Sequence, residues 1–337
     1  MISLSSTLRG LLRRTMHRHV LGLVVTLVFL PLTDAARAQA GEPIRVLAGF
    51  AAGGSLDALA RLAAEALGQA TGRPTIVENK TGAGGRIALD QLKAASPDGL
   101  VVAVAPQGPM TLFPYVFRNL RFDPQKDFTP IAVVATGDFA ISTGPLTGAT
   151  NMAELRAWLK ANPDKASFGS PGAGTLPHFI GLRTAEVLGV KMTNVPYRGS
   201  APSMTDLAGG TIPVAVSPVT EALELHKAGR VRILATAAAQ RTPFVDGVPT
   251  LKELGYDVDV PLWFALYGPA GMQAEVVERY NRAIAQVFAQ PQARQRIASL
   301  GLVAPVPMTS AQIAAMRDRE LAMWGPVVKA SGFTPND

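Results

Sequence analysis

The chain has no cysteine, few aromatic residues and few charged ones, and these shortages exclude several classes of protein. Phe, Trp and Tyr make up 6% of the 337 residues, and Asp, Glu, Lys and Arg make up 17%, whereas 48% are hydrophobic. Without cysteine there is no disulfide-stapled scaffold and no lipid-anchored N-terminal cysteine. The apolar content excludes a disordered tail, and the 32 Gly and 26 Pro follow no collagen-like repeat. We therefore expect a globular protein of about two domains.

Long hydrophobic runs are also missing. An apolar stretch at residues 20–32 (VLGLVVTLVFLPL) is too short to span a membrane core of about 30 Å. It is preceded by four arginines and followed by two small-x-small cleavage patterns, which end at Ala38 and Ala40. This pattern predicts a signal peptide over residues 1–40, cleaved near Ala38 or Ala40, and the pair Arg13-Arg14 leaves both Sec and twin-arginine export open. We expect a soluble protein of the bacterial periplasm, since no other apolar stretch reaches 18 residues.

Most of the positive charge belongs to this predicted signal. The formal net charge is +7, but residues 1–40 hold five arginines and one acidic residue, which leaves +3 on the mature chain. No basic stripe remains there, and aromatic residues are scarce. The sequence therefore predicts no nucleic-acid partner.

From residue 41 the sequence alternates short β-rich runs with helical ones, which is typical of an α/β protein with largely parallel sheets. Four strand–loop–helix units have glycine at the turn: strands 44–50, 75–78, 166–169 and 191–195, with helices 55–67, 87–94 and 176–188 and one that begins near Ser200. Ser55 is the predicted N-cap of the first helix, and Asp57 lies in its first turn. Further strands are expected at 100–105, 231–235 and 264–268, and helices at 275–289, 292–299 and 310–330, with a capping box at Thr309 and Gln312. Residues 237–261 are expected to be a connector with one short helix at 251–254.

The glycine loops point toward an anionic ligand. Free backbone N–H groups converge at the start of a helix, and glycine lets a ligand approach the backbone closely. A single such loop is weak evidence, because any tight turn needs glycine, but this chain has four.

Enzyme motifs are not found. The run Gly82-Ala83-Gly84-Gly85-Arg86-Ile87 ends in Ile where a dinucleotide fingerprint needs Gly or Ala, and there is no Walker A pattern. Residues 168–172 (FGSPG) miss the nucleophile elbow by one position. The mature chain has only His178 and His226, and neither lies in a metal-binding pattern. We therefore predict no catalytic residue, no metal site and no cofactor.

Eight short motifs, in order, resemble the substrate-binding receptors of tripartite tricarboxylate transporters, also called Bug receptors. They are residues 50–57 (FAAGGSLD) with Arg61, residues 77–85 (VENKTGAGG), 97–99 (PDG), 127–131 (DFTPI), 195–199 (VPYRG), 206–210 (DLAGG), Arg241 with 248–255 (VPTLKELG), and 269–271 (PAG). The resemblance spans residues 42–332. Two positions depart from the family pattern: Ala52 stands where the family usually has Pro, and Lys80-Thr81 where it usually has Arg-Pro.

The resemblance implies a two-lobed periplasmic binding protein, type II-like, with a ligand cleft between α/β lobes. We expect one lobe at 41–140 and 264–337 and the other at 141–263. The family's site residues, carried onto this sequence, predict a proximal grip on a small carboxylate by Phe50, Ala52, Gly53, Gly54, Asp57, Thr81, Gly82, Ala83, Gly84 and Gly85. The predicted distal contacts are Ser170, Gly174, Thr175, His178, Pro196, Tyr197, Arg198 and Gly199. The residues alone also fit structural roles at two of these positions: Asp57 as a residue that holds its loop, and His178 as a packed or capping residue.

The resemblance also implies partners. A monomeric receptor would deliver its ligand to a permease of one large and one small membrane subunit. The same cleft would suit a sensory module that docks a membrane sensor kinase, and this alternative stays open, as does, more remotely, an exported enzyme.

Overall fold

Residues 41–334 are described by this computed structural model of the chain, and their strands form two five-stranded sheets. The predicted signal peptide and its cleavage sites lie outside the described residues. The first sheet has the order β2-β1-β3-β10-β4, and its strands are β1 (Ile44–Ala48), β2 (Thr75–Asn79), β3 (Val101–Pro106), β4 (Phe128–Gly137) and β10 (Leu262–Pro269). The second has the order β7-β6-β8-β5-β9, with β5 (Phe139–Thr143), β6 (Ser167–Ser170), β7 (Thr193–Pro196), β8 (Val214–Pro218) and β9 (Arg232–Thr236).

Both sheets follow one plan. A central strand, β1 or β6, has a parallel neighbour on each side, and one strand of each sheet, β10 or β5, runs antiparallel to its two neighbours. The expected largely parallel sheets are therefore mixed. The reversed strands lie beside the points where the chain leaves the first sheet, between Gly137 and Phe139, and returns to it at Leu262, which pairs with Gly137.

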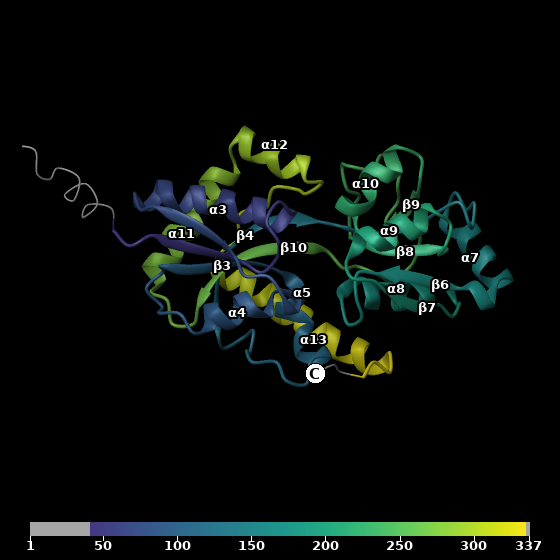
Figure 1. The fold of residues 1–337 in the computed structure, drawn as a ribbon, viewed down its shortest axis with the longest axis horizontal. Helices are drawn as coiled ribbons and strands as arrows, with labels where there is room; N and C mark the ends of the chain where they lie inside the picture. Colours follow the sequence, from purple (N-terminus) through teal and green to yellow (C-terminus); the bar gives the residue numbers. More distant parts are fainter. Residues whose placement is uncertain (1–40, 335–337) are drawn as a thin grey trace, which may run out of the picture. The chain divides into compact units, whose positions relative to one another are not determined.

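Helices cover both faces of each sheet (Figure 1). On the first sheet, α3 (Ser55–Thr71) and α11 (Ala274–Phe288) pack on the face that holds Ile44 and Val46. The opposite face, with Leu47 and Ala103, is covered by α4 (Arg86–Lys93), and Met316 of α13 (Ser310–Ala330) packs there as well. The remaining helices are α5 (Gln107–Thr111), α6 (Phe113–Val116), α7 (Met152–Ala161), α8 (Leu176–Leu188), α9 (Ser200–Ala208), α10 (Val219–Lys227) and α12 (Pro291–Ser299). Alternating faces explain this layering, since successive side chains of a strand point in opposite directions.

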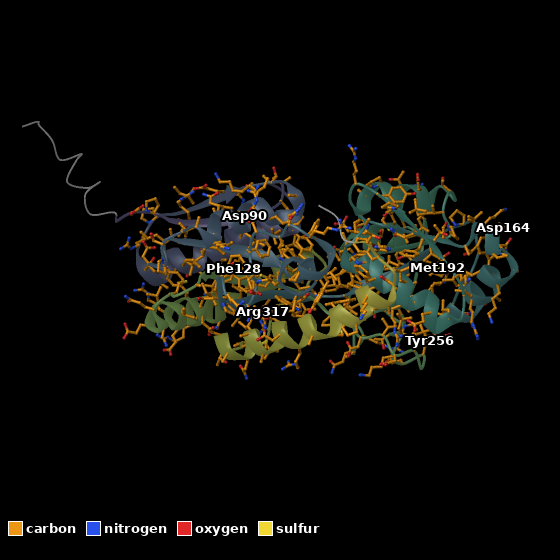
Figure 2. The ribbon with its side chains drawn as sticks, turned by 90° about the horizontal axis from the view of Figure 1, so that it is seen from below. Asp90, Phe128, Asp164, Met192, Tyr256 and Arg317 are labelled. Carbon is orange, nitrogen blue, oxygen red and sulfur yellow. The ribbon has the colours of Figure 1, made fainter. Side chains whose placement is uncertain are left out.

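The C-terminal helix α13 is tied to the first sheet by polar contacts. Arg317, labelled in Figure 2, is buried and donates from Nη1 to the carbonyl oxygen of Pro124 at 2.7 Å. Ser310 donates to the carbonyl oxygen of Pro130, in β4, at 2.6 Å. The predicted capping box is confirmed at the N-terminus of α13, where Thr309 and Gln312 exchange hydrogen bonds of 2.8 and 3.2 Å.

The four predicted strand–loop–helix units are confirmed, and α8 has the predicted bounds. Two local predictions are wrong. Gly54, with extended backbone, is the N-cap of α3, and Ser55 is its first helical residue. Residues 251–255 form hydrogen-bonded turns instead of a helix, because Leu251 donates its N–H to Thr236 and so ties the segment to the end of β9. The expected lobe boundaries stay a prediction.

Across residues 41–334, every helix is too short or too polar to span a bilayer.

Candidate ligand-binding site

The loop after β1 is held in shape by a buried carboxylate. Asp57 is 4% exposed, and its Oδ2 accepts hydrogen bonds from the Gly53 N–H at 3.0 Å and from Arg61 Nε at 2.9 Å. Its Oδ1 accepts from Asn79 Nδ2 at 3.0 Å and from Arg61 Nη2 at 3.1 Å. Asn79, the last residue of β2, also donates to the Phe50 carbonyl at 3.0 Å. Asp57 therefore fastens the first glycine loop to the end of the neighbouring strand, and its own oxygens face these donors.

The same contacts account for the acidity of Asp57. Burial by itself would raise the pKa of this carboxyl group, but the hydrogen bonds from Arg61, the Gly53 N–H and Asn79 outweigh burial and hold the pKa below its ordinary value. Asp57 is thus ionised at neutral pH.

The first turn of α3 presents unengaged backbone donors. Among the described residues, the N–H groups of Gly54, Ser55 and Leu56 have no hydrogen-bond acceptor, and the first backbone bond of the helix runs from Ala58 to Gly54. Ala52, Gly53 and Gly54 are exposed. A helix N-terminus with free N–H groups favours an anion.

The loop after β2 is a second set of exposed amides. Gly82, Ala83, Gly84 and Gly85 all have positive φ, from 48° to 124°, and residues 81–84 are exposed. Within the described chain the backbone N–H groups of residues 81–84 have no hydrogen-bond partner. A Cβ on Gly84 would lie 3.1 Å from the Phe113 ring. The positive φ at Gly84 favours glycine, and a Cβ there would also make a tight contact with the Phe113 ring.

A small cavity of about 10 Å³ lies where these loops meet the end of β3 and the helix α4. It is lined by Gly49, Phe50 and Gly85 together with Pro106, the last residue of β3, and Pro109 of α5. The loops after β1 and β2 are thus brought together with the end of β3 and the start of α5, at the carboxyl ends of parallel strands where open α/β sheets bind ligands. The sequence predictions missed this third strand end, which has no glycine run; its position after the predicted strand 100–105 was the available signal.

The predicted distal loops are also brought together, but by their own side chains and backbone. Tyr197 donates its N–H to the Ser170 carbonyl at 2.9 Å, and Gly199 donates to Pro171 at 3.0 Å. The Ser170 hydroxyl donates to Asn194 Oδ1 at 2.7 Å, and the Thr175 hydroxyl to the Gly172 carbonyl at 2.7 Å. These two hydroxyl protons are therefore already committed inside the protein.

Tyr197 and His178 are packed as well. The Tyr197 hydroxyl donates to Asp206 at 2.7 Å, and burial together with this carboxylate raises the pKa of Tyr197 to about 12. His178 is 8% exposed, its Nδ1 accepts from the Gly174 N–H at 3.1 Å, and its ring lies 5.0 Å from Phe179 and 5.7 Å from Phe333. Burial lowers the pKa of His178, so the imidazole is neutral at pH 7. His178 here supports the distal loop.

Two distal residues are open to solvent. Pro196 and Arg198 are exposed, and Arg198 has neither an ion pair nor a side-chain hydrogen bond with any residue in 41–334. The hydrogen bonds described above join proximal residues to proximal residues and distal residues to distal residues. Among the residues that the structure covers, no three His, Asp or Glu side chains are grouped so that they could hold a metal ion.

The fold is that of a two-lobed periplasmic solute-binding protein. The periplasmic binding protein BugD is 29% identical, with a TM-score of 0.75 over 87% of this chain and 99% of its own. MatC from Rhodopseudomonas palustris, solved with bound malate, is 28% identical, with a TM-score of 0.73 over 85% of this chain and 98% of its own. R. palustris Rpa4515, solved with adipate, is 27% identical, with a TM-score of 0.78 over 88% and 100% of the two chains.

The family model of the tripartite tricarboxylate transporter family receptor matches residues 59–333, and the chain belongs to that family. The family and fold expected from the sequence are thereby confirmed. Proteins of this family and fold are solute-binding proteins, which are not enzymes.

Proposed function

We propose that the protein is an exported receptor that binds a small carboxylate through backbone N–H groups of the loops after β1 and β2 and delivers it to a membrane permease of one large and one small subunit. One observation carries this proposal: Asp57 fastens the first glycine loop to Asn79 at the end of β2, and the backbone N–H groups of Gly54–Leu56 and of the exposed residues 81–84 have no partner within the described residues. The membership of the family supports the permease as the recipient.

Backbone donors are strong enough for this task. A hydrogen bond to a charged group contributes roughly 1.5–3 kcal/mol, so four or five would contribute about 6–15 kcal/mol before ordering costs. Micromolar affinity needs about −8 kcal/mol. No arginine clamp is therefore required at the proximal loops.

The ligand class follows from the charges at the loops. Both Asp57 oxygens already accept hydrogen bonds, so this carboxylate has no position for a ligand ammonium group. The exposed Arg198 on the distal side would suit a second carboxylate. MatC and Rpa4515 were solved with malate and adipate, two dicarboxylates that carry no amine. We therefore propose a dicarboxylate without an amino group as the ligand.

The test is ligand screening of the protein purified from the periplasm, by thermal shift and then by calorimetry. We expect malate, adipate or a related diacid to raise Tm and bind with roughly micromolar Kd, and aspartate and glutamate to bind at least tenfold more weakly. Folded protein that binds none of a broad carboxylate panel would contradict the proposal, and tighter binding of the amino acids would contradict the ligand class. Loss of diacid uptake in cells that lack the receptor checks the transport role.

A further inference from the structure

The loop after β2, residues 81–85, is held by side chains on several sides. Three of its glycines lie against apolar side chains: Gly82 against Ile87, Gly84 against Phe113 and Gly85 against Phe50. Ala83 is held by a polar contact to its backbone instead, since its carbonyl oxygen accepts from the backbone N–H of Arg86 and from Arg86 Nε, the second at 2.9 Å. Apolar contacts restrain where the loop lies, whereas a hydrogen bond also restrains how the peptide unit is turned.

An aromatic ring supports the guanidinium group of Arg86. The Arg86 Cζ lies 3.9 Å from the centroid of the Phe117 ring, a distance at which a cation–π contact forms. Phe117 in turn packs edge-on against Phe113, with 4.9 Å between the ring centroids, and Phe113 is the ring next to Gly84. The peptide unit between Ala83 and Gly84 is therefore held at its carbonyl by Arg86 and at its other end by Phe113.

The guanidinium group of Arg86 is directed to this loop and not to a carboxylate. Across residues 41–334 no ion pair includes Arg86. Asp90 lies one turn further along α4, and its buried Oδ1 accepts no hydrogen bond from the described residues. Arg121 lines the same hollow of about 360 Å³ beside Ala83, but its side chain makes no hydrogen bond within the described chain. Two arginines thus lie near the loop, and one of them holds its backbone.

The orientation of one peptide unit decides whether the loop offers a donor or an acceptor. The Ala83 carbonyl and the Gly84 N–H belong to the same trans peptide unit, so they point in opposite directions. The carbonyl points to Arg86, and the Gly84 N–H, which has no partner within the described chain, points away from it. A half turn of this unit would exchange the two groups and present a carbonyl oxygen to a carboxylate. Glycine at position 84 makes such a turn accessible, because glycine adopts φ of either sign.

We propose that Arg86 is a positioning residue that, supported by Phe117, holds the Ala83–Gly84 peptide unit with its N–H turned toward the bound carboxylate. This inference rests on the proposed function, in which the N–H groups of residues 81–84 bind the ligand. Arg86 acts through the backbone of the loop, and its charge does not touch the ligand. The loop then meets the ligand in its binding conformation, so little conformational entropy is lost on capture.

The orientation of the peptide unit is tested first without ligand, by NMR spectroscopy of protein isotope-labelled at alanine carbonyl carbons and glycine nitrogens. This labelling selects the Ala–Gly peptide units, and Ala83→Ser identifies the Ala83–Gly84 signal by removing it. In Arg86→Met we expect the Ala83 carbonyl resonance to move upfield, as when a carbonyl loses a hydrogen bond, and the Gly84 line to broaden by exchange. The control Arg121→Met removes the same charge from the same hollow and should leave both resonances unchanged. A carbonyl resonance that does not move upfield in R86M would overturn the inference.

The consequence for binding is measured by calorimetry with malate and adipate. We expect about tenfold weaker binding in R86M, a similar loss in Phe117→Leu, which leaves every charge in place, and no further loss in the double variant, since both side chains act on one peptide unit. R121M should bind within about twofold of the wild type. Circular dichroism checks the fold of F117L, and R86M and R121M decide the question if F117L is unfolded.

Equal losses of affinity in R86M and R121M would show that the arginines attract the ligand by charge alone, and would overturn the inference. Normal affinity in folded F117L, or additive losses in the double variant, would do the same. If neither acid nor any other carboxylate binds, the proposed function fails, while the carbonyl resonance still decides whether Arg86 holds the peptide unit.

Discussion

The two sheets carry the same strand plan but use the loops at their strand ends differently. In each, a central strand has a parallel neighbour on both sides, and the loops after the first two strands lead into helices. In the first sheet residues 51–54 and 81–84 of these loops are exposed, the N–H groups of Gly54 and of residues 81–84 are unengaged, and Asp57 and Asn79 hold the first loop from behind. In the second sheet, Ser170, Thr175 and Tyr197 direct their polar atoms inward. The shared topology therefore places loops at the sheet edge. The contacts of the side chains then decide whether the backbone N–H groups of these loops are free to bind a ligand.

From this comparison we expect the largest loss of carboxylate affinity when the backbone shape of a loop at the first sheet is changed. Gly84→Val should reduce carboxylate affinity more than 100-fold, because it places a β-branched residue at φ 67°, brings a Cβ to 3.1 Å from Phe113 and displaces amides that contribute roughly 1.5–3 kcal/mol each. Calorimetry measures the affinity, and circular dichroism checks the fold. The control Gly247→Val has a similar φ of 73° in an exposed turn with open space around it, and it should bind normally. Equal losses in both variants would mean that general destabilisation is responsible.

Removing the fastening carboxylate should have the next largest effect. Asp57→Asn leaves Gly53, Arg61 and Asn79 without a charged acceptor, and we expect about tenfold to 100-fold weaker binding and a lower Tm. Because the pKa of Asp57 is lowered on folding, its stabilising contribution is present above the unfolded value of about 3.9 and is lost as pH falls through the folded pKa. Acid unfolding of wild type and D57N measures this difference. The control Glu65→Gln on the same helix removes an exposed ion pair with Arg296 and should change neither affinity nor acid stability. An equal effect in this control would contradict the role of Asp57 in fastening the first glycine loop.

On the second sheet, a charge should matter more than backbone shape. Arg198→Gln is expected to weaken diacid binding roughly tenfold at low salt and less at high salt, as an exposed ion pair would. The Tm of the ligand-free protein should stay the same, since Arg198 has no partner within the described chain. Arg183→Gln, which removes a half-buried arginine on α8 that pairs with Glu186 and Asp257, is the control for loss of a positive charge and should bind normally. Unchanged affinity in R198Q at every salt concentration would show that the distal loop contributes no charge.

The smallest effect on affinity is expected at His178. His178→Leu leaves the Gly174 N–H without its acceptor, so we expect a loss of stability of about 1–3 kcal/mol but an affinity within about threefold of wild type. Because burial lowers the pKa of His178, wild-type stability should decline as pH falls below about 6.5, and the decline should be smaller in H178L, where His226, whose pKa burial also lowers, still contributes. Urea unfolding at pH 5.5 and 7.5 measures both. A large loss of affinity with intact stability would make His178 a ligand contact after all.

Local patterns predicted more of the first sheet's site than of the second's. Glycine runs at 53–54 and 82–85 mark backbone positions whose conformation is set within a few residues, and the structure shows positive φ at Gly53, Gly82 and Gly84. In the distal loops the decisive partners are remote in sequence: Ser170 bonds Asn194, and His178 packs against Phe333. The strands β4, β5 and β8 and the helices α7 and α10 went unpredicted, because short apolar runs without glycine turns do not distinguish strand from helix.

The sequence by itself determined the α/β class, the four glycine turns, the capping box of α13 and the membership of a receptor family, because propensity, capping and motif order act over neighbouring residues. Only the tertiary structure decided that Asp57 fastens a loop, that His178 is packed and that Arg86 lies on the Phe117 ring. These facts depend on burial and on contacts between residues as far apart as 178 and 333. Burial changes the pKa of a carboxyl group or an imidazole, and no local pattern in the chain records it.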